Sequence, residues 1–135
     1  MSDADVEFVR EALDLFISND RDGAFARWSQ DCVAVPPPEW PELGIAEGRE
    51  EVQAVFQGFD EAFGPDWPTR MKIERIVDVG EGRVFAELAW RPSGATSGAP
   101  VDQPLSHIYT VKNGAIVRGD FFLGYEPGRE AAGLA

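Results

Sequence analysis

Residues 103–123 read QPLSHIYTVKNGAIVRGDFFL, and this stretch decides the fold. Apolar and polar residues alternate up to Asn113-Gly114 and alternate again beyond it. Asn-Gly between two such runs is typical of a type I′ turn, because both turn residues need a positive φ that asparagine and glycine tolerate. The stretch therefore predicts two antiparallel strands, 103–112 and 115–123, joined by a two-residue turn.

A turn of two residues also predicts which side chains of this hairpin share a face of the sheet. It places Tyr109 opposite Arg118, and His107 opposite Asp120. A histidine beside a carboxylate in an apolar hollow can move protons near neutral pH, since the carboxylate orients the ring and burial shifts both pKa values. The same arrangement is typical of a polar ladder on a sheet surface, so both interpretations stay open.

Outside the hairpin the chain divides into a helical first part and a strand-rich second part. Apolar residues recur at helical spacing over residues 3–17, over 22–28 and from Arg49 to Phe63. From residue 69 the period changes to two, and it predicts strands at 70–79, 83–91, 103–112 and 115–123, with a loop at 92–100. Helices followed by antiparallel strands predict a single α+β domain over residues 1–135, with helices on one face of a curled sheet.

The helix expected from Arg49 to Phe63 carries an apolar stripe that should lie across the concave side of this sheet. The stripe consists of Val52, Val55, Phe56, Phe59 and Phe63. Ahead of it, a proline-rich segment holds Trp40 on a stiff extended backbone. That segment is either a rigid connector whose tryptophan covers the core or a loop that lines a pocket, and the sequence leaves both possibilities open.

Composition restricts the possible functions. The 135 residues include 12 Lys and Arg against 24 Asp and Glu, for a formal charge of −12, so neither nucleic acid nor a membrane surface is an expected partner. Cys32 is the only cysteine and His107 the only histidine, which argues against a disulfide and an ordinary zinc site. The chain shows no signal-peptide layout and no membrane-spanning apolar run, so a cytoplasmic protein is expected.

Four stretches resemble the nuclear transport factor 2-like superfamily, and especially its SnoaL-like polyketide cyclases and ketosteroid isomerases. They are PPPEWPE (36–42), EGREEV (47–52), VKNGAIV (111–117) and REAAGL (129–134). The resemblance implies a cone-shaped, curved antiparallel sheet wrapped around a long helix, with N-terminal helices closing an apolar pocket, and a homodimer formed through the outer surface of the sheet. It also implies that Asp120 and His107 occupy the positions of the acid/base Asp and the neighbouring His of the cyclases.

The expected pocket would hold a small apolar or aromatic molecule, with no metal and no cofactor. Besides the catalytic candidates Asp120 and His107, its expected lining residues are Tyr109, Arg118, Phe122, Phe56, Phe59, Trp28, Trp40 and Trp90. In the enzymatic interpretation Asp120 takes a proton next to a carbonyl, His107 assists, and Tyr109 or Arg118 stabilises the enolate, as in an isomerase or cyclase. The alternatives are a non-catalytic ligand-binding homodimer and an epoxide hydrolase-like enzyme.

The opposite face of the hairpin indicates self-association. With the predicted register it carries Ile108, Thr110, Val117, Phe121 and Leu123. None of the helices predicted above is left to cover this face. An uncovered apolar patch of this kind usually marks an interface, so the sequence predicts a homodimer.

Overall fold

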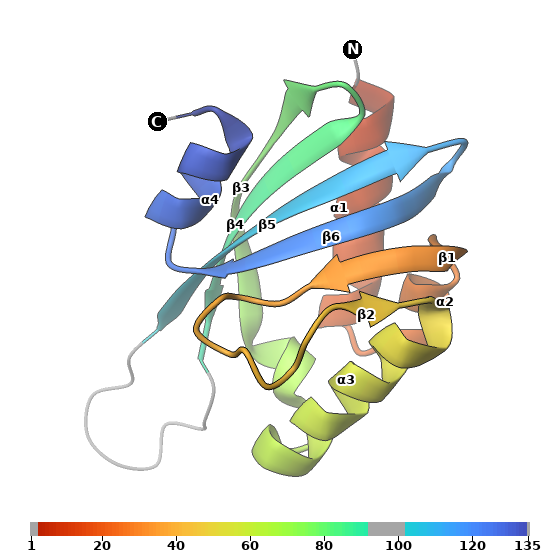
Figure 1. Cartoon of the computed structure of the whole chain (residues 1–135), viewed down its shortest axis with the longest axis vertical. Helices are drawn as coiled ribbons and strands as arrows, with labels where there is room; N and C mark the ends of the chain where they lie inside the picture. The colour runs from red at the N-terminus through yellow and green to blue at the C-terminus, as the bar shows by residue number, and fades with distance from the viewer. Residues whose placement is uncertain (1–2, 92–101, 135) are drawn as a thin grey trace.

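A curved sheet with helices on both faces makes up the chain (Figure 1). The computed structural model describes residues 3–91 and 102–134, so the loop expected at 92–100 lies outside the described residues. The helices are α1 (Asp3–Ile17), α2 (Arg21–Phe25), α3 (Arg49–Phe63), the 3-10 turn η1 (Trp67–Arg70) and α4 (Glu126–Ala132). The strands are β1 (Trp28–Val35), β2 (Ala46–Glu47), β3 (Met71–Gly80), β4 (Arg83–Trp90), β5 (Gln103–Lys112) and β6 (Ala115–Leu123). The α+β fold class with a curved sheet is confirmed.

The strands lie in the order β2-β1-β6-β5-β4-β3. Four neighbouring pairs are antiparallel, and the three among β3, β4, β5 and β6 are as predicted, but β1 runs parallel to β6. The strands β1 and β2 were not predicted, and the prediction of a helix that carries Trp28 is wrong, because α2 ends at Phe25 and Trp28 begins β1. The strand β1 was hidden because its pairing partner, β6, lies more than eighty residues further along the chain, a distance that local periodicity does not sense.

The hairpin of β5 and β6 has the predicted turn but not the predicted register. Asn113 and Gly114 have φ values of 53° and 75°, and Lys112 lies opposite Ala115 as a two-residue turn requires. One step later β6 contains an extra residue, Val117, so that Thr110 pairs with Arg118. This β-bulge moves every later side chain of β6 to the other face relative to the prediction.

The corrected register separates the two predicted catalytic residues. His107 lies opposite Phe121, and Asp120 lies opposite Ile108, so the predicted pairing of His107 with Asp120 is wrong. The pairing of Tyr109 with Arg118 is wrong for the same reason, since Tyr109 lies opposite Gly119. A bulge sharpens the bend and twist of a strand, and β6 also pairs irregularly with β1 at this point.

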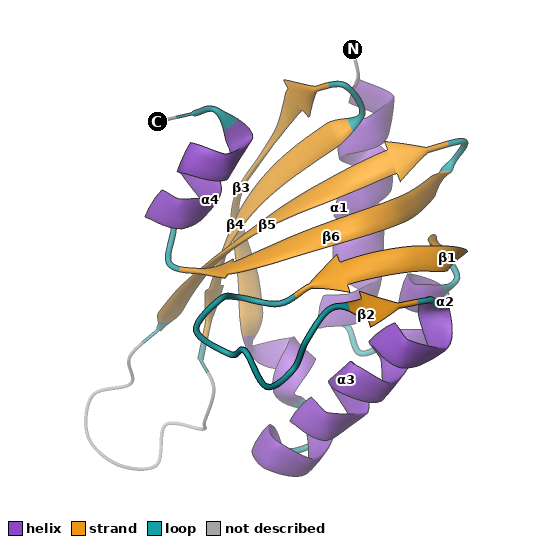
Figure 2. Ribbon diagram, viewed as in Figure 1, coloured by secondary structure: helices purple, strands orange, loops and turns teal. Residues whose placement is uncertain are grey.

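Helices cover the two faces of the sheet differently (Figure 2). The long helix α1 crosses behind the sheet and packs against β3 and β4, while α3 packs against β1 and β2. Helix α4, which the sequence analysis did not predict, packs on the opposite face against β5 and β6. Pro127 in its first turn and Gly133 at its C-cap, with φ of 78°, were the available signals.

The homodimer prediction therefore loses its premise. Ala132 of α4 buries Ile108 and Phe85 in a second core cluster, so a helix does cover part of the outer face. Phe121 and Leu123, which were assigned to that face, lie instead on the inner side of the sheet. Self-association stays a prediction, now without an uncovered apolar patch to support it.

The helix α3 matches its predicted bounds, and its apolar stripe faces the core. Val52 is completely buried, while Val55, Phe56, Phe59 and Phe63 are half-buried and pack against the main core cluster. Phe56 contacts the rings of Phe16 and Phe25 with centroid distances of 5.3 and 5.4 Å. The stripe thus joins helices far apart in the sequence into one aromatic core.

Candidate functional site

A cavity of about 120 Å³ lies between the helices and the inner face of the sheet. Its wall comes from α1, α2, α3, η1, all six described strands and the segment between β1 and β2. No Asp, Glu, Lys or Arg is among the described residues that line it. The hollow is therefore shaped for a molecule that is mostly apolar.

Most of the residues predicted for a pocket do line this cavity. They are His107, Tyr109, Phe56, Phe59, Trp28, Trp40 and Trp90. Phe122 also borders the cavity, but it lies opposite Ser106 and packs against the outer cluster of Phe85 and Ile108. Several lining residues were not predicted, and Trp67, Phe16, Phe25 and Phe121 are the largest of them. Periodicity gave no signal for Trp67, which sits on a short 3-10 turn after Gly64 and Pro65.

Asp120 and Arg118 are absent from the described cavity wall. They lie on the opposite face of β6, where Arg118 Nε donates to Asp120 Oδ2 at 3.0 Å. The ion pair raises the pKa of Arg118, whose side chain is 51% exposed. These two residues therefore form an ion pair along β6, and neither takes part in the cross-strand polar pair predicted for it.

His107 and Tyr109 form a polar pair on the cavity wall. They are two residues apart on β5, so their side chains share a face, and His107 Nδ1 lies 2.6 Å from the Tyr109 hydroxyl. The His107 ring also meets Phe121 edge to face, with 4.6 Å between ring centroids. Burial lowers the pKa of His107 from 6.5 to about 3, and burial raises the pKa of Tyr109. Both groups are therefore uncharged at neutral pH.

The proline-rich segment between β1 and β2 contributes a wall of the cavity. Trp40 packs edge to face on Phe59 of α3, with 5.9 Å between ring centroids, and Pro36, Pro37 and Leu43 line the cavity beside it. The two interpretations of this segment thus describe one arrangement, because Trp40 covers the core and lines the cavity at the same time.

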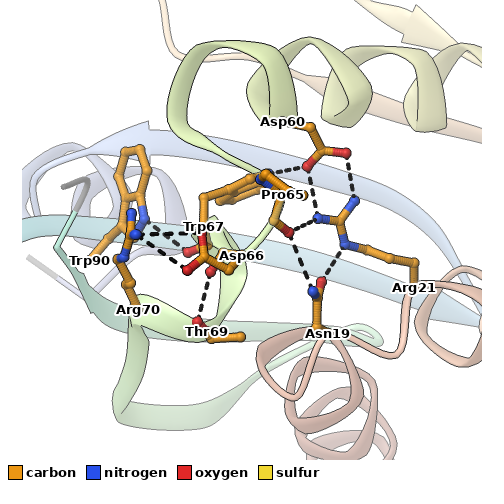
Figure 3. Close-up of polar contacts among 9 residues, drawn as sticks. All are labelled: Asn19, Arg21, Asp60, Pro65, Asp66, Trp67, Thr69, Arg70 and Trp90. Carbon is orange, nitrogen blue, oxygen red and sulfur yellow. Dashed lines mark hydrogen bonds and ion pairs between the residues drawn. The ribbon is translucent and has the colours of Figure 1, made fainter. Parts of the chain in front are cut away.

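A network of polar contacts holds the end of α3 against the loop between α1 and α2 (Figure 3). Arg21 donates to both carboxylate oxygens of Asp60, at 2.8 and 3.1 Å, and also to the carbonyl oxygen of Pro65. The Trp67 indole donates to the same carboxylate at 2.8 Å. Hydrogen bonds from Arg21 hold the pKa of Asp60 below its ordinary value. The network fixes the orientation of Trp67, one of the largest rings in the cavity wall.

Other chemistries find no support in the described part of the chain. Residues 3–91 and 102–134 contain no group of three or more His, Cys, Asp or Glu side chains that could hold a metal ion. Within the same ranges no helix is long and apolar enough to cross a membrane. Cys32 is completely buried, and burial raises the pKa of its thiol, so it packs as a small apolar residue.

Comparison with known proteins supports one fold. A family model described as a SnoaL-like domain matches residues 9–119, whereas none of the curated proteins matches the chain. An NTF2-like protein of unknown function from Burkholderia pseudomallei is 20% identical, with a TM-score of 0.70, covering 99% of this chain and 98% of that one. TerC, co-crystallised with polyporic acid, is 14% identical, with a TM-score of 0.72 and coverage of 96% and 98%. Bal32a, from a soil-derived mobile gene cassette, is 20% identical, with a TM-score of 0.70 and coverage of 87% and 86%.

Proposed function

Because the chain belongs to the SnoaL-like domain family, we propose that its cavity binds a small, largely apolar molecule without a cofactor. The observation that carries this proposal is the composition of the wall, where aromatic and aliphatic side chains surround one polar pair, His107 and Tyr109. Ligand sites in proteins commonly combine an apolar lining with a few polar groups that orient the ligand. The proposal is supported by TerC, a structural neighbour that was co-crystallised with polyporic acid.

A catalytic form of the proposal is isomerase or cyclase chemistry by proton transfer. It would depend on His107 and Tyr109, which are the acid/base side chains among the described residues of the cavity wall. The earlier assignment of Asp120 as the base receives no support from the geometry, since its carboxylate faces away and is paired with Arg118. Binding is therefore the function that the site supports best.

Fluorescence offers a direct test of binding, since all four tryptophans of the chain line the cavity. The probe is N-phenylnaphthylamine, an uncharged dye that becomes fluorescent in apolar surroundings. We expect saturable binding of one dye per chain, accompanied by quenching of tryptophan emission.

Two neighbouring positions on α3 give a matched pair of variants for this test. Val55 lines the cavity, whereas Ala54 is exposed, so Val55→Phe fills the hollow and Ala54→Phe adds the same ring outside it. We expect Val55→Phe to weaken dye binding at least tenfold and Ala54→Phe to leave it unchanged, with circular dichroism confirming that both variants fold. Asp120→Asn should also bind like the wild type, because this residue lies on the outer face. Equal binding by the Val55 and Ala54 variants would place the dye elsewhere and contradict the proposal.

A further inference from the structure

The second ring nitrogen of His107 has no hydrogen-bond partner in the described part of the chain. Nδ1 lies 2.6 Å from the Tyr109 hydroxyl, whereas no partner is found for Nε2 among residues 3–91 and 102–134. Although His107 as a residue is only 8% exposed, its Nε2 atom is not fully enclosed, since it is absent from the described side-chain atoms that are both enclosed and without a partner. Since His107 lines the cavity, this nitrogen is a polar group open to whatever the cavity holds.

Two arrangements of protons are compatible with the short contact between His107 and Tyr109. In the first, the tyrosine O–H donates to Nδ1, and the ring proton resides on Nε2. In the second, Nδ1–H donates to the tyrosine oxygen, and Nε2 carries only a lone pair. The two arrangements present opposite hydrogen-bonding characters to the cavity, a donor in the first and an acceptor in the second.

The surroundings favour the first arrangement. In the second, both the tyrosine O–H and the lone pair of Nε2 would be unpaired, because the described residues offer the Tyr109 hydroxyl no partner besides His107. In the first, only the Nε2–H group awaits a partner. Buried polar groups without partners carry a desolvation cost, so the arrangement with fewer of them is more stable.

We propose that His107 presents an Nε2–H donor to the cavity, held in this tautomer by the Tyr109 hydroxyl, and that the ligand is an uncharged apolar molecule with an acceptor oxygen, such as a ketone or quinone. The ligand part of this inference rests on the proposed binding function. The indole N–H groups of Trp67 and Trp90 on the same wall already donate to Asp60 and to the Trp67 carbonyl oxygen, and those of Trp28 and Trp40 can act only as donors.

The absence of charge on the described wall explains why the ligand should be uncharged. A carboxylate or ammonium group entering this hollow would leave water without meeting an opposite charge, which strongly disfavours its binding. Nor does His107 supply that charge, because burial keeps its pKa near 3 and the ring stays neutral at physiological pH. From the elements packed around it, His107 meets the hydroxyl of Tyr109 and the ring of Phe121.

The tautomer can be measured without any ligand, because His107 is the only histidine of the chain. In a ¹⁵N-labelled sample, two-dimensional NMR of the imidazole shows which ring nitrogen carries the proton. We expect the Nε2–H form at pH 7 in the wild type, and a rise of the Nδ1–H form in Tyr109→Phe, which lacks the hydroxyl donor. A predominant Nδ1–H form in the wild type, or a protonated ring, would overturn the tautomer assignment.

The ligand class is tested with three probes of one shape: tetralin, its ketone α-tetralone, and tetralin carboxylate. Quenching of tryptophan emission gives the affinity for each probe. The quantity compared is the affinity for the ketone divided by the affinity for the hydrocarbon. We expect His107→Phe to lower this ratio about tenfold, as loss of one hydrogen bond to a buried acceptor requires. We expect the carboxylate to bind the wild type at least tenfold more weakly than the ketone does.

The possible outcomes separate this inference from the proposed function. An unchanged ratio in His107→Phe, or a carboxylate that binds as well as the ketone, would overturn the ligand class while leaving the binding function in place. If none of the three probes binds the wild type, the binding function fails and the ligand class fails with it. The NMR measurement then still decides the tautomer by itself.

Discussion

Lowering the pH from 8 to 5 should destabilise this protein through His107, because acid protonates this ring in the unfolded chain but not in the folded one. Burial lowers the pKa of His107 from 6.5 to about 3. A group whose pKa is lower in the folded state binds protons preferentially in the unfolded state, so stability falls as the pH decreases below 6.5. Above pH 6.5 the ring is neutral in both states and its contribution is constant.

The size of the effect follows from the two pKa values. Each pH unit between them changes the free energy of unfolding by about 1.4 kcal/mol, so a decrease from pH 6.5 to 5 removes about 2 kcal/mol. His107 is the only histidine, and no other side-chain type ordinarily titrates between pH 5 and 8. The shifts at Asp60, below 3.8, and at Cys32, above 9.0, lie outside this range. The pH dependence can therefore be assigned to one residue.

Urea unfolding, followed by circular dichroism at pH 5, 6, 7 and 8, measures this effect. We expect the wild type to lose about 2 kcal/mol more than His107→Phe between pH 8 and 5, since the variant has no imidazole to protonate. Subtracting the loss of unfolding free energy measured for the variant removes the contribution of the many carboxylates near pH 5. Tyr109→Phe retains the buried ring and should keep the wild-type pH dependence. Parallel curves for the wild type and His107→Phe would refute the reasoning, because they would show a ring that is protonated as easily in the folded protein as in the unfolded chain.

Two further predictions concern stability. Gly58 lies on α3 with open space around the position of a Cβ, so Gly58→Ala should stabilise the protein by about 0.5–1 kcal/mol in urea unfolding. Gly128→Ala would place a Cβ 2.0 Å from Ser106 Oγ and should destabilise the protein by about 1–3 kcal/mol. Equal effects of the two substitutions would contradict the packing of α4 against β5. Arg21→Met removes the paired hydrogen bonds to Asp60 and should cost about 1 kcal/mol at pH 7. Because the pKa of Asp60 is lowered in the folded state, the stabilisation by this ion pair is present above pH 3.8 and is lost as the pH falls through the folded pKa. If Arg21→Met destabilised the protein equally at pH 7 and pH 2, the ion pair would not be the source of the stabilisation.

Local sequence determined the elements whose causes are local. The bounds of α3 follow from its apolar period together with Gly48 before it and Gly64-Pro65 after it, and they match the prediction. The turn at Asn113 and Gly114 follows from two residues that accept a positive φ. The aromatic residues that α3 contributes to the cavity, Phe56 and Phe59, were also recognisable, because large apolar rings on one face of a helix seek the core whatever packs against them.

Only the tertiary structure decided which polar residues reach the cavity. Strand side chains alternate between faces, so the single extra residue Val117 is enough to turn Asp120 outward and to leave His107 facing Phe121. That bulge lies where β6 pairs in parallel with β1, a strand from a distant part of the chain. The two strands are close there, since a Cβ on Gly119 would lie 2.8 Å from the Trp28 ring. A local pattern holds no information about such a contact. The sequence by itself therefore determined that His107 and Tyr109 share a face of β5, whereas the register of β6 removed Asp120 from that face and left Tyr109 as the partner of His107.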